Sequence, residues 1–170
     1  RIWFSQDSPT QYFPMVFTSF RLEYKLWGLN PTGYHVINII LHIINAVLLW
    51  RLLQCLSIPA AWVAAAIFAL HPVQVESVAW ITERKNLLMT FFFFLSLMTY
   101  LRFLQASGNT RHSQIWYVSS LVLYAASLLS KTTACTMPAA IVLLLWFMKR
   151  PLNKNRWAQI MPYVVLGLAM

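Results

Sequence analysis

Residues 70–86 read LHPVQVESVAWITERKN, and this stretch interrupts two strongly apolar runs. Its ionisable side chains are His71, Glu76, Glu83, Arg84 and Lys85. Charged groups beside apolar sequence are costly in a bilayer, so they mark either structural pairs or a functional site. Pro72 lacks a backbone donor, which predicts that the helix before it kinks or ends there. The stretch therefore predicts a broken helix whose polar part lies at a membrane boundary.

The composition is that of an integral membrane protein. Of 170 residues, 59% are hydrophobic and 10% are charged, with a mean hydropathy of +0.60; soluble domains average about 25% charged residues. The net charge of +9 comes from short basic clusters between apolar runs, as in topology signals, so we expect no nucleic-acid partner. The sequence has no GxGxxG, P-loop, CxxC or HExxH motif, so we expect no bound cofactor and assign no residue as a metal ligand, while metal dependence stays open.

The apolar runs predict an all-α, polytopic helical bundle. We expect about five complete transmembrane helices and a truncated sixth, because a span needs about 20 apolar residues. Residues 1–33 are expected to form an extracytoplasmic loop with an interfacial amphipathic helix, and residues 34–170 to form the bundle. The last apolar run is too short to cross alone, so we expect the chain to be a fragment of a longer protein. The expected spans lie at 34–56, from 60 to the break at Pro72, and at 87–104, 115–129, 133–148 and 160–170.

The first span carries a polar stripe formed by His35, Asn38, His42 and Asn45. At about 100° per residue, these four positions fall within about 80° of one another. Such a stripe should face away from lipid. Two interpretations remain open: hydrogen bonds between helices, or the lining of a substrate cavity, favoured toward the His35 end.

Loop charges predict the orientation. The strongest basic cluster lies in residues 149–156, which we place in the cytoplasm. Counting crossings backward then puts residues 1–31, 71–85 and 130–133 together on the extracytoplasmic face. We therefore expect these three segments to meet at one site.

The residue types of that face suit a phosphorylated sugar. Glu76 and Glu83 lie within about 20° of one helical face with Trp80 between them, and carboxylates beside an exposed indole suit a sugar ring. Arg84, Lys85 and Lys131 together could neutralise a phosphate or pyrophosphate. The apolar neighbours of Glu76 suggest that it is partly buried.

Each residue also has a plainer interpretation. Glu83 to Lys85 could be a solvated helix end, and Lys131 could extend to the interface. His71 could transfer protons or donate to a phosphate, or it could bond a carbonyl beside Pro72.

Three segments carry a resemblance to a known family. They are YFPMVFTSFRLEYKLWGLNPTGYHVINIILHIINAVLLW (12–50), FALHPVQVESVAWITERKNLL (68–88) and LLSKTTACTMPA (128–139). The chain resembles the transmembrane-and-tetratricopeptide-repeat O-mannosyltransferases, and more narrowly their bacterial relatives. The resemblance implies a GT-C glycosyltransferase fold and a repeat domain beyond residue 170. It also implies transfer of a sugar from a polyprenyl- or dolichyl-phosphate donor to protein hydroxyls outside the cytoplasm. We expect the sugar to be mannose.

The resemblance also implies roles for particular residues. The general base, an acidic residue of the first outer loop, is expected upstream of Arg1; Asp7 does not match that sequence context. The fragment alone is therefore expected to be inactive. The expected partners are the bilayer, the lipid-linked sugar and a protein acceptor, in a bacterial inner membrane or the endoplasmic reticulum membrane. The expected site residues are His71 and Glu76 as catalytic groups; Arg84, Lys85 and Lys131 on the donor phosphate; Trp80 and Glu83 on the sugar or acceptor; and His35, Asn38 and His42 lining the cavity.

Two other functions remain open. A membrane anchor that presents repeats to partners would tolerate Glu76→Gln and His71→Ala. A lipid-linked sugar transporter would need polar residues at mid-membrane on several helices, whereas only the first span carries a sustained stripe.

Overall fold

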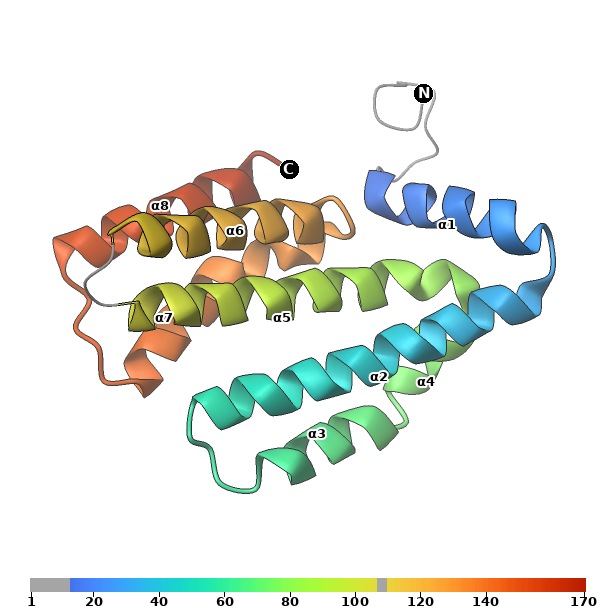
Figure 1. Cartoon of the computed structure of the whole chain (residues 1–170), viewed down its shortest axis with the longest axis horizontal. Coiled ribbons are helices and arrows are strands. Elements are labelled where there is room, and N and C mark those ends of the chain that lie inside the picture. The colour runs from blue at the N-terminus through green and yellow to red at the C-terminus, as the bar shows by residue number, and fades with distance from the viewer. Residues whose placement is uncertain (1–12, 107–109) are drawn as a thin grey trace. The chain divides into compact units, whose positions relative to one another are not determined.

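The computed structural model describes residues 13–106 and 110–170, and those residues form helices and connections without strands. The all-α prediction is thus confirmed for the described part of the chain. Residues 1–12, with Asp7 and the first part of the expected loop, lie outside it, as do residues 107–109. The helices are α1 (Pro14–Trp27), α2 (Pro31–Cys55), α3 (Ala61–Leu70), α4 (Gln74–Ala79), η1 (Ile81–Glu83), α5 (Arg84–Gln105), α6 (Thr110–Leu128), η2 (Thr132–Thr136), α7 (Met137–Phe147) and α8 (Lys154–Leu168) (Figure 1).

The chain divides into two compact units. Unit 1 comprises residues 1–91 and 129–131, and unit 2 comprises residues 92–128 and 132–170. The helix α5 contributes its start to unit 1 and its remainder to unit 2. The expected boundary at residue 33 stays a prediction, although α1 packs with α2 inside unit 1.

Two helical stretches of the described residues are long and apolar enough to cross a membrane. They are Pro31–Cys55 and Ile81–Gln105, of 25 residues each. Ala61–Leu70 and Thr132–Phe147 are apolar but shorter. Membrane character is therefore supported for α2 and α5, whereas the expected count of five complete spans is not confirmed.

The turn between α1 and α2 follows from its residue types. Gly28 adopts a φ of 58°, which glycine tolerates without steric cost. The Asn30 side chain accepts from the Thr32 N–H at 3.0 Å and caps α2, while Pro31 occupies the first turn, where no backbone donor is needed. A side chain at Gly33 would meet the Trp27 ring, since a Cβ there would lie 2.5 Å from Trp27 Cγ. The turn thus brings the end of α1 against the start of α2.

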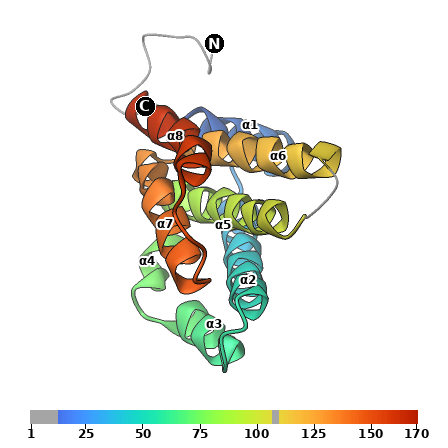
Figure 2. The ribbon, with the colours of Figure 1, turned by 90° about the vertical axis from the view of Figure 1, so that its left-hand side faces the viewer.

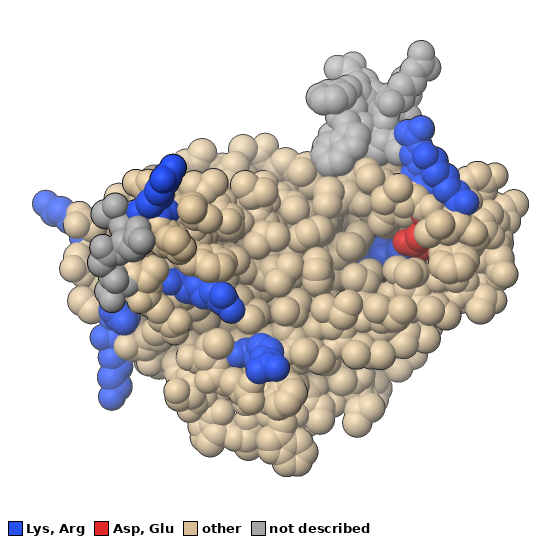
Figure 3. All heavy atoms as spheres, in the orientation of Figure 1, with Lys and Arg blue, Asp and Glu red and all other residues tan. Residues whose placement is uncertain are grey.

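The surface of α2 is inverted relative to a helix of a soluble protein. Its exposed side chains include Val36, Ile39, Ile40, Ile43, Ile44 and Val47. Its buried residues are Asn38, His42, Asn45 and Leu52. Branched apolar side chains facing outward and amides facing inward suit a helix surrounded by lipid. Figure 3 shows a face on which Lys and Arg are sparse and most atoms belong to uncharged residues.

The chain breaks at Pro72 as the sequence predicts. The helix α3 ends at Leu70, and His71 is extended with φ −66° and ψ 130°, the conformation that a following proline favours. The Val73 N–H then donates to His71 Nδ1 at 3.2 Å instead of continuing the helix. The short helix α4 begins at Gln74, and both α3 and α4 pack on α2. Figure 2 shows α3 next to α2.

Unit 2 is held by polar bonds between its helices. Ser96 Oγ of α5 donates to the Ser120 carbonyl of α6 at 2.8 Å. The Tyr163 hydroxyl of α8 donates to Ser120 Oγ at 2.8 Å. All three side chains are buried, and their hydrogen bonds link α5, α6 and α8. In a bilayer such bonds help helices to associate, because apolar side chains contact lipid as favourably as they contact another helix.

Candidate functional site

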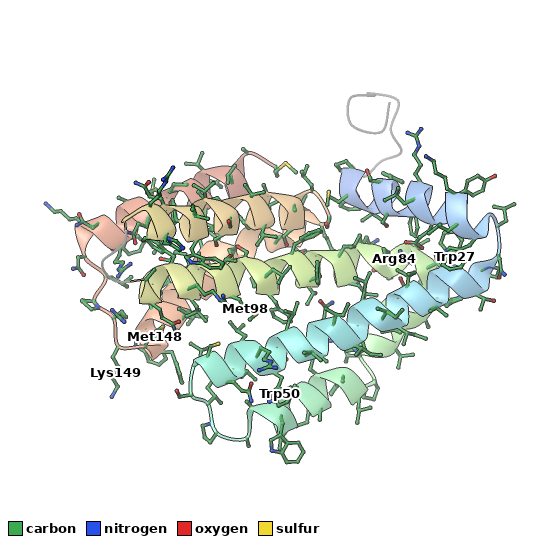
Figure 4. All side chains as sticks on the ribbon, viewed as in Figure 1. Trp27, Trp50, Arg84, Met98, Met148 and Lys149 are labelled. Carbon is green, nitrogen blue, oxygen red and sulfur yellow. The ribbon has the colours of Figure 1, made fainter. Side chains whose placement is uncertain are left out.

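Three segments distant in sequence meet in unit 1. The Met15 N–H of α1 donates to the Leu129 carbonyl at 3.5 Å. Arg84 of α5 pairs with Glu23 of α1, and Lys131 donates to Asn86 of α5. The predicted meeting of the N-terminal segment, the stretch around residues 71–85 and residues 130–133 is therefore confirmed. Figure 4 shows Arg84 where the start of α5 lies beside α2.

Arg84 is at the centre of a buried network. Its side chain is 0% exposed, and one of its terminal nitrogens, Nη1, donates to Glu23 Oε1. Its Nε donates to Asn38 Oδ1, and Nη2 donates to the Tyr34 carbonyl at 2.9 Å. The guanidinium carbon also lies 5.2 Å from the Phe20 ring centroid, in cation–π range. The network joins α1, α2 and α5.

This placement corrects the expected role of Arg84. A fully buried guanidinium with an acidic partner and two further acceptors is not presented to a donor phosphate. The partner Glu23 lies 61 residues away in sequence, so local pattern gave no sign of the pair. Arg84 orders unit 1, and the phosphate-binding prediction reduces to Lys85 and Lys131.

The polar stripe of α2 contacts backbone carbonyls of the broken stretch and of the helices α3 and α5 on either side of it. Asn38 Nδ2 donates to the carbonyls of Val78 and Trp80, each at 3.2 Å. His42 Nε2 lies 3.0 Å from the Ala69 carbonyl, and Asn45 Nδ2 donates to the Leu87 carbonyl at 3.0 Å. Irregular backbone at membrane depth needs such partners, because lipid supplies none. Of the two interpretations of the stripe, hydrogen bonding between helices is confirmed for these three residues.

A second polar cluster, here called the lysine cluster, consists of Ser77, Glu83, Lys85, Asn86 and Lys131. Lys131 Nζ donates to Asn86 Oδ1, while Asn86 Nδ2 donates to Glu83 Oε2 at 2.7 Å and to Ser77 Oγ at 3.1 Å. Lys85 Nζ lies 3.0 Å from Glu83 Oε1. The side chains of Lys85 and Glu83 remain 22% and 17% exposed. The structure thus brings together the predicted residues Glu83, Lys85 and Lys131.

An apolar groove runs along α2 and α3. Its first cavity, of about 450 Å³, is lined by His35, His42 and His71, with Gln74 and apolar residues of α2, α3 and α4. A second cavity, of about 390 Å³, extends toward Trp50 and Trp62. The two cavities share His42, Ala69 and Leu70 and so form one groove. His35 and His42 border this groove, whereas Asn38 belongs to the Arg84 network; that the groove is a substrate cavity stays a prediction.

The remaining expected site residues are exposed. Trp80 is 59% exposed, and Glu76 and His71 are also exposed. The expectation that Glu76 is partly buried was wrong: Glu76 is exposed, and the α4 residues that line the groove are Gln74, Val75, Val78 and Ala79. The α4 helix therefore borders the groove through Val75 and Val78 and the lysine cluster through Ser77.

Sequence reasoning missed Glu23, Ser77 and Asn86. One signal for Glu23 was available, since it is one of only four acidic residues and lies on a helix whose other charged residues, Arg21 and Lys25, are basic. Asn86 closes the string ERKN but has no charge to draw notice. Within residues 13–106 and 110–170, no three His, Cys, Asp or Glu side chains are grouped so as to hold a metal ion.

Comparison of the sequence with known proteins assigns the chain to a family. Residues 7–170 match the family described as dolichyl-phosphate-mannose-protein mannosyltransferase. The chain is 32% identical over 134 residues to the protein O-mannosyl-transferase TMTC2 of Mus musculus, covering 78% of this chain and 16% of that protein. It is 32% identical over 152 residues to the protein O-mannosyl-transferase TMTC4 of Mus musculus, which covers 78% of this chain and 20% of that protein. It is 36% identical over 130 residues to the protein O-mannosyl-transferase Tmtc2 of Drosophila melanogaster, which covers 72% of this chain and 14% of that protein.

The chain spans about a sixth of the length of the first of these curated relatives. No solved structure matches it. The family match covers nearly all of the chain, including both units and every residue of the lysine cluster. The chain therefore belongs to the dolichyl-phosphate-mannose-protein mannosyltransferase family.

Proposed function

We propose that the complete protein is a membrane glycosyltransferase that moves mannose from a polyprenyl- or dolichyl-phosphate donor to protein hydroxyls on the extracytoplasmic side. The observation that carries the proposal is the family match over residues 7–170. The relatives' names, protein O-mannosyl-transferases, support the sugar and the acceptor class. The lipid-linked donor enters as a substrate, and the enzyme acts in a multi-pass membrane setting.

The lysine cluster suits the donor phosphate. An ammonium group carries three N–H donors. Lys131 uses one on Asn86, and Lys85 pairs with Glu83, which leaves donors of both for a ligand. Both lysines are partly exposed. Lys85 lies in the first turn of α5, and Lys131 contacts that same turn through Asn86; this end of α5 would lie at the membrane boundary. We place the phosphate of the donor, and of the leaving lipid phosphate, between them.

The α2–α3 groove suits the isoprenoid chain. Its lining is apolar apart from the histidines and Gln74. The α2 residues from His35 to Trp50 span about 22 Å at about 1.5 Å per residue, enough for several isoprene units. His35 and His71 mark the end of the groove nearest the start of α2, so the polar end of the lipid would lie there.

The remaining roles are those that the family resemblance implies, and the exposure of Trp80, His71 and Glu76 leaves these three side chains accessible. We propose that Trp80 and Glu83 contact the sugar or the acceptor, and that His71 and Glu76, both exposed, take part in proton transfer beside the leaving phosphate. A carboxylate upstream of residue 1 would activate the acceptor hydroxyl, and attack at the anomeric carbon would invert its configuration.

The test is a transfer assay with the complete protein in membranes or detergent. We expect labelled mannose to move to a protein acceptor from polyprenyl-phosphate mannose and not from a nucleotide-linked mannose. Transfer from the nucleotide sugar would contradict the proposed donor. Absence of transfer from either donor, by a folded protein, would favour a scaffold that presents partners at the membrane.

A further inference from the structure

Asn86 is the point at which the lysine cluster is held together. It lies in the first turn of α5, next to Lys85 and three residues after Glu83. Its Oδ1 accepts from Lys131 Nζ. Its Nδ2 donates to Glu83 Oε2 at 2.7 Å and to Ser77 Oγ at 3.1 Å. One amide therefore contacts residues from α4, η1 and the segment that follows α6.

The partners fix which way the amide points. A lysine ammonium can only donate, and an ionised carboxylate can only accept. The oxygen of Asn86 must therefore face Lys131, and its nitrogen must face Glu83. A carboxamide supplies this acceptor and these two donors from one branch point. Aspartate would offer only acceptors, and leucine, of similar size, would offer neither.

The arrangement also separates the Lys131 ammonium from the Glu83 carboxylate. Glu83 forms its ion pair with Lys85, whereas the acceptor that Lys131 contacts is the neutral amide of Asn86. A cation bonded to a neutral acceptor keeps its full charge for an anionic ligand. A direct carboxylate partner would instead compete with a phosphate for the same ammonium.

We propose that Asn86 is a positioning residue that holds the Lys131 ammonium in place without neutralising it, so that Lys131 can bind the phosphate of the lipid-linked donor. The inference rests on the proposed function and adds the residue that sets the charge of its phosphate site. Asn86 acts through Lys131 and Glu83 and does not itself contact the donor.

The test compares Asn86→Asp with Asn86→Leu in the complete protein. Asn86→Asp places a carboxylate against Lys131 and beside Glu83, so we expect KM for polyprenyl-phosphate mannose to rise about tenfold or more, the equivalent of one charged hydrogen bond. Asn86→Leu frees Lys131 but leaves its charge, so we expect a smaller rise. In both variants kcat should change less than KM.

The matched control is Asn153→Asp, which makes the same chemical change at an exposed position preceding α8. It should leave KM for the donor unchanged. Size-exclusion profile and thermal midpoint establish that each variant is folded. As a second measurement, binding of sugar-free polyprenyl phosphate, followed by tryptophan fluorescence, should weaken in the order wild type, Asn86→Leu, Asn86→Asp.

Two results would overturn the inference. One is an equal effect of Asn86→Asp and Asn86→Leu, which would mean that the amide only anchors the fold. The other is a KM for Asn86→Asp that matches Asn153→Asp. In both cases wild-type transfer from the lipid donor would persist, so the proposed function would stand; its own failure is loss of that transfer in the wild type.

Discussion

Arg84 and Lys131 are both cations in unit 1, and their partners give them different roles. Arg84 is fully buried and bonded to a carboxylate, an amide and a carbonyl. Lys131 is partly exposed and bonded to a neutral amide. A buried charge is tolerated when it is paired, and it becomes costly when its partner is removed. The first residue therefore stabilises the unit, and the second is available to a ligand.

The Glu23–Arg84 pair gives a prediction on stability. Arg84→Met leaves the Glu23 carboxylate buried without its counter-ion, so we expect a loss of about 3–5 kcal/mol in the free energy of unfolding. Glu23→Leu should cost a similar amount. The double variant, which removes both charges, should recover a large part of either loss. Thermal unfolding of the complete protein in detergent measures the cycle, and additive losses would show that the two residues do not interact.

Lys131 gives a prediction on donor binding. Lys131→Ala should raise KM for the lipid-linked donor about tenfold or more and leave the thermal midpoint nearly unchanged, because it removes a charged donor to phosphate from a partly exposed position. Lys154→Ala, at an exposed position at the start of α8, is the matched control. A donor titration that is the same for Lys131→Ala as for wild type would remove Lys131 from the site.

At the scale of the helices, the α2 stripe contacts backbone carbonyls on both sides of the Pro72 break. Asn38 and Asn45 of α2 donate to the carbonyls of Val78 in α4 and Leu87 in α5, and His42 Nε2 lies 3.0 Å from the Ala69 carbonyl near the end of α3. Sequence periodicity could predict both the stripe and the break, because each is local. It could not predict that the stripe bonds the broken backbone, since that depends on how α2 and α3 pack.

The α2 stripe predicts an order of stabilities. Asn38→Leu removes bonds to two carbonyls and to Arg84, whereas Asn45→Leu removes one bond and an Oδ1 that has no partner among the described residues. Each lost bond between membrane helices costs about 0.6–2 kcal/mol. We therefore expect Asn38→Leu to lower the thermal midpoint more than Asn45→Leu. Ile44→Leu, at an exposed position on the same helix, should have little effect. The reverse order of the two asparagines would contradict the account.

At the scale of the whole molecule, the sequence sufficed for the helical class, the family and the meeting of three segments in unit 1. These depend on composition, on extended motifs and on the alternation of loops. The sequence alone did not suffice to predict the division into two units or the burial of Arg84. Both arise from contacts between residues far apart in the chain, such as Glu23 and Arg84, which no local pattern records.

The predicted orientation has its own test. Cys55 and Cys135 are both exposed and free, and the charge of the loops places them at opposite faces of the bilayer. In sealed vesicles of the complete protein with its other cysteines replaced, a membrane-impermeant maleimide added outside should label one of the two and leave the other. Single variants Cys55→Ser and Cys135→Ser identify which is labelled. Labelling of both from one side would contradict the predicted topology.

The central claim is that unit 1 binds the lipid-linked donor, and photolabelling tests it most directly. A polyprenyl phosphate with a photoreactive group in its chain would be irradiated with the complete protein, and the labelled peptides identified by mass spectrometry. We predict labels on α2 and α3 in the groove between His42 and Trp62, reduced by excess unlabelled polyprenyl phosphate and by Lys131→Ala. Labels confined to other parts of the protein, or labelling indifferent to competitor, would contradict the account.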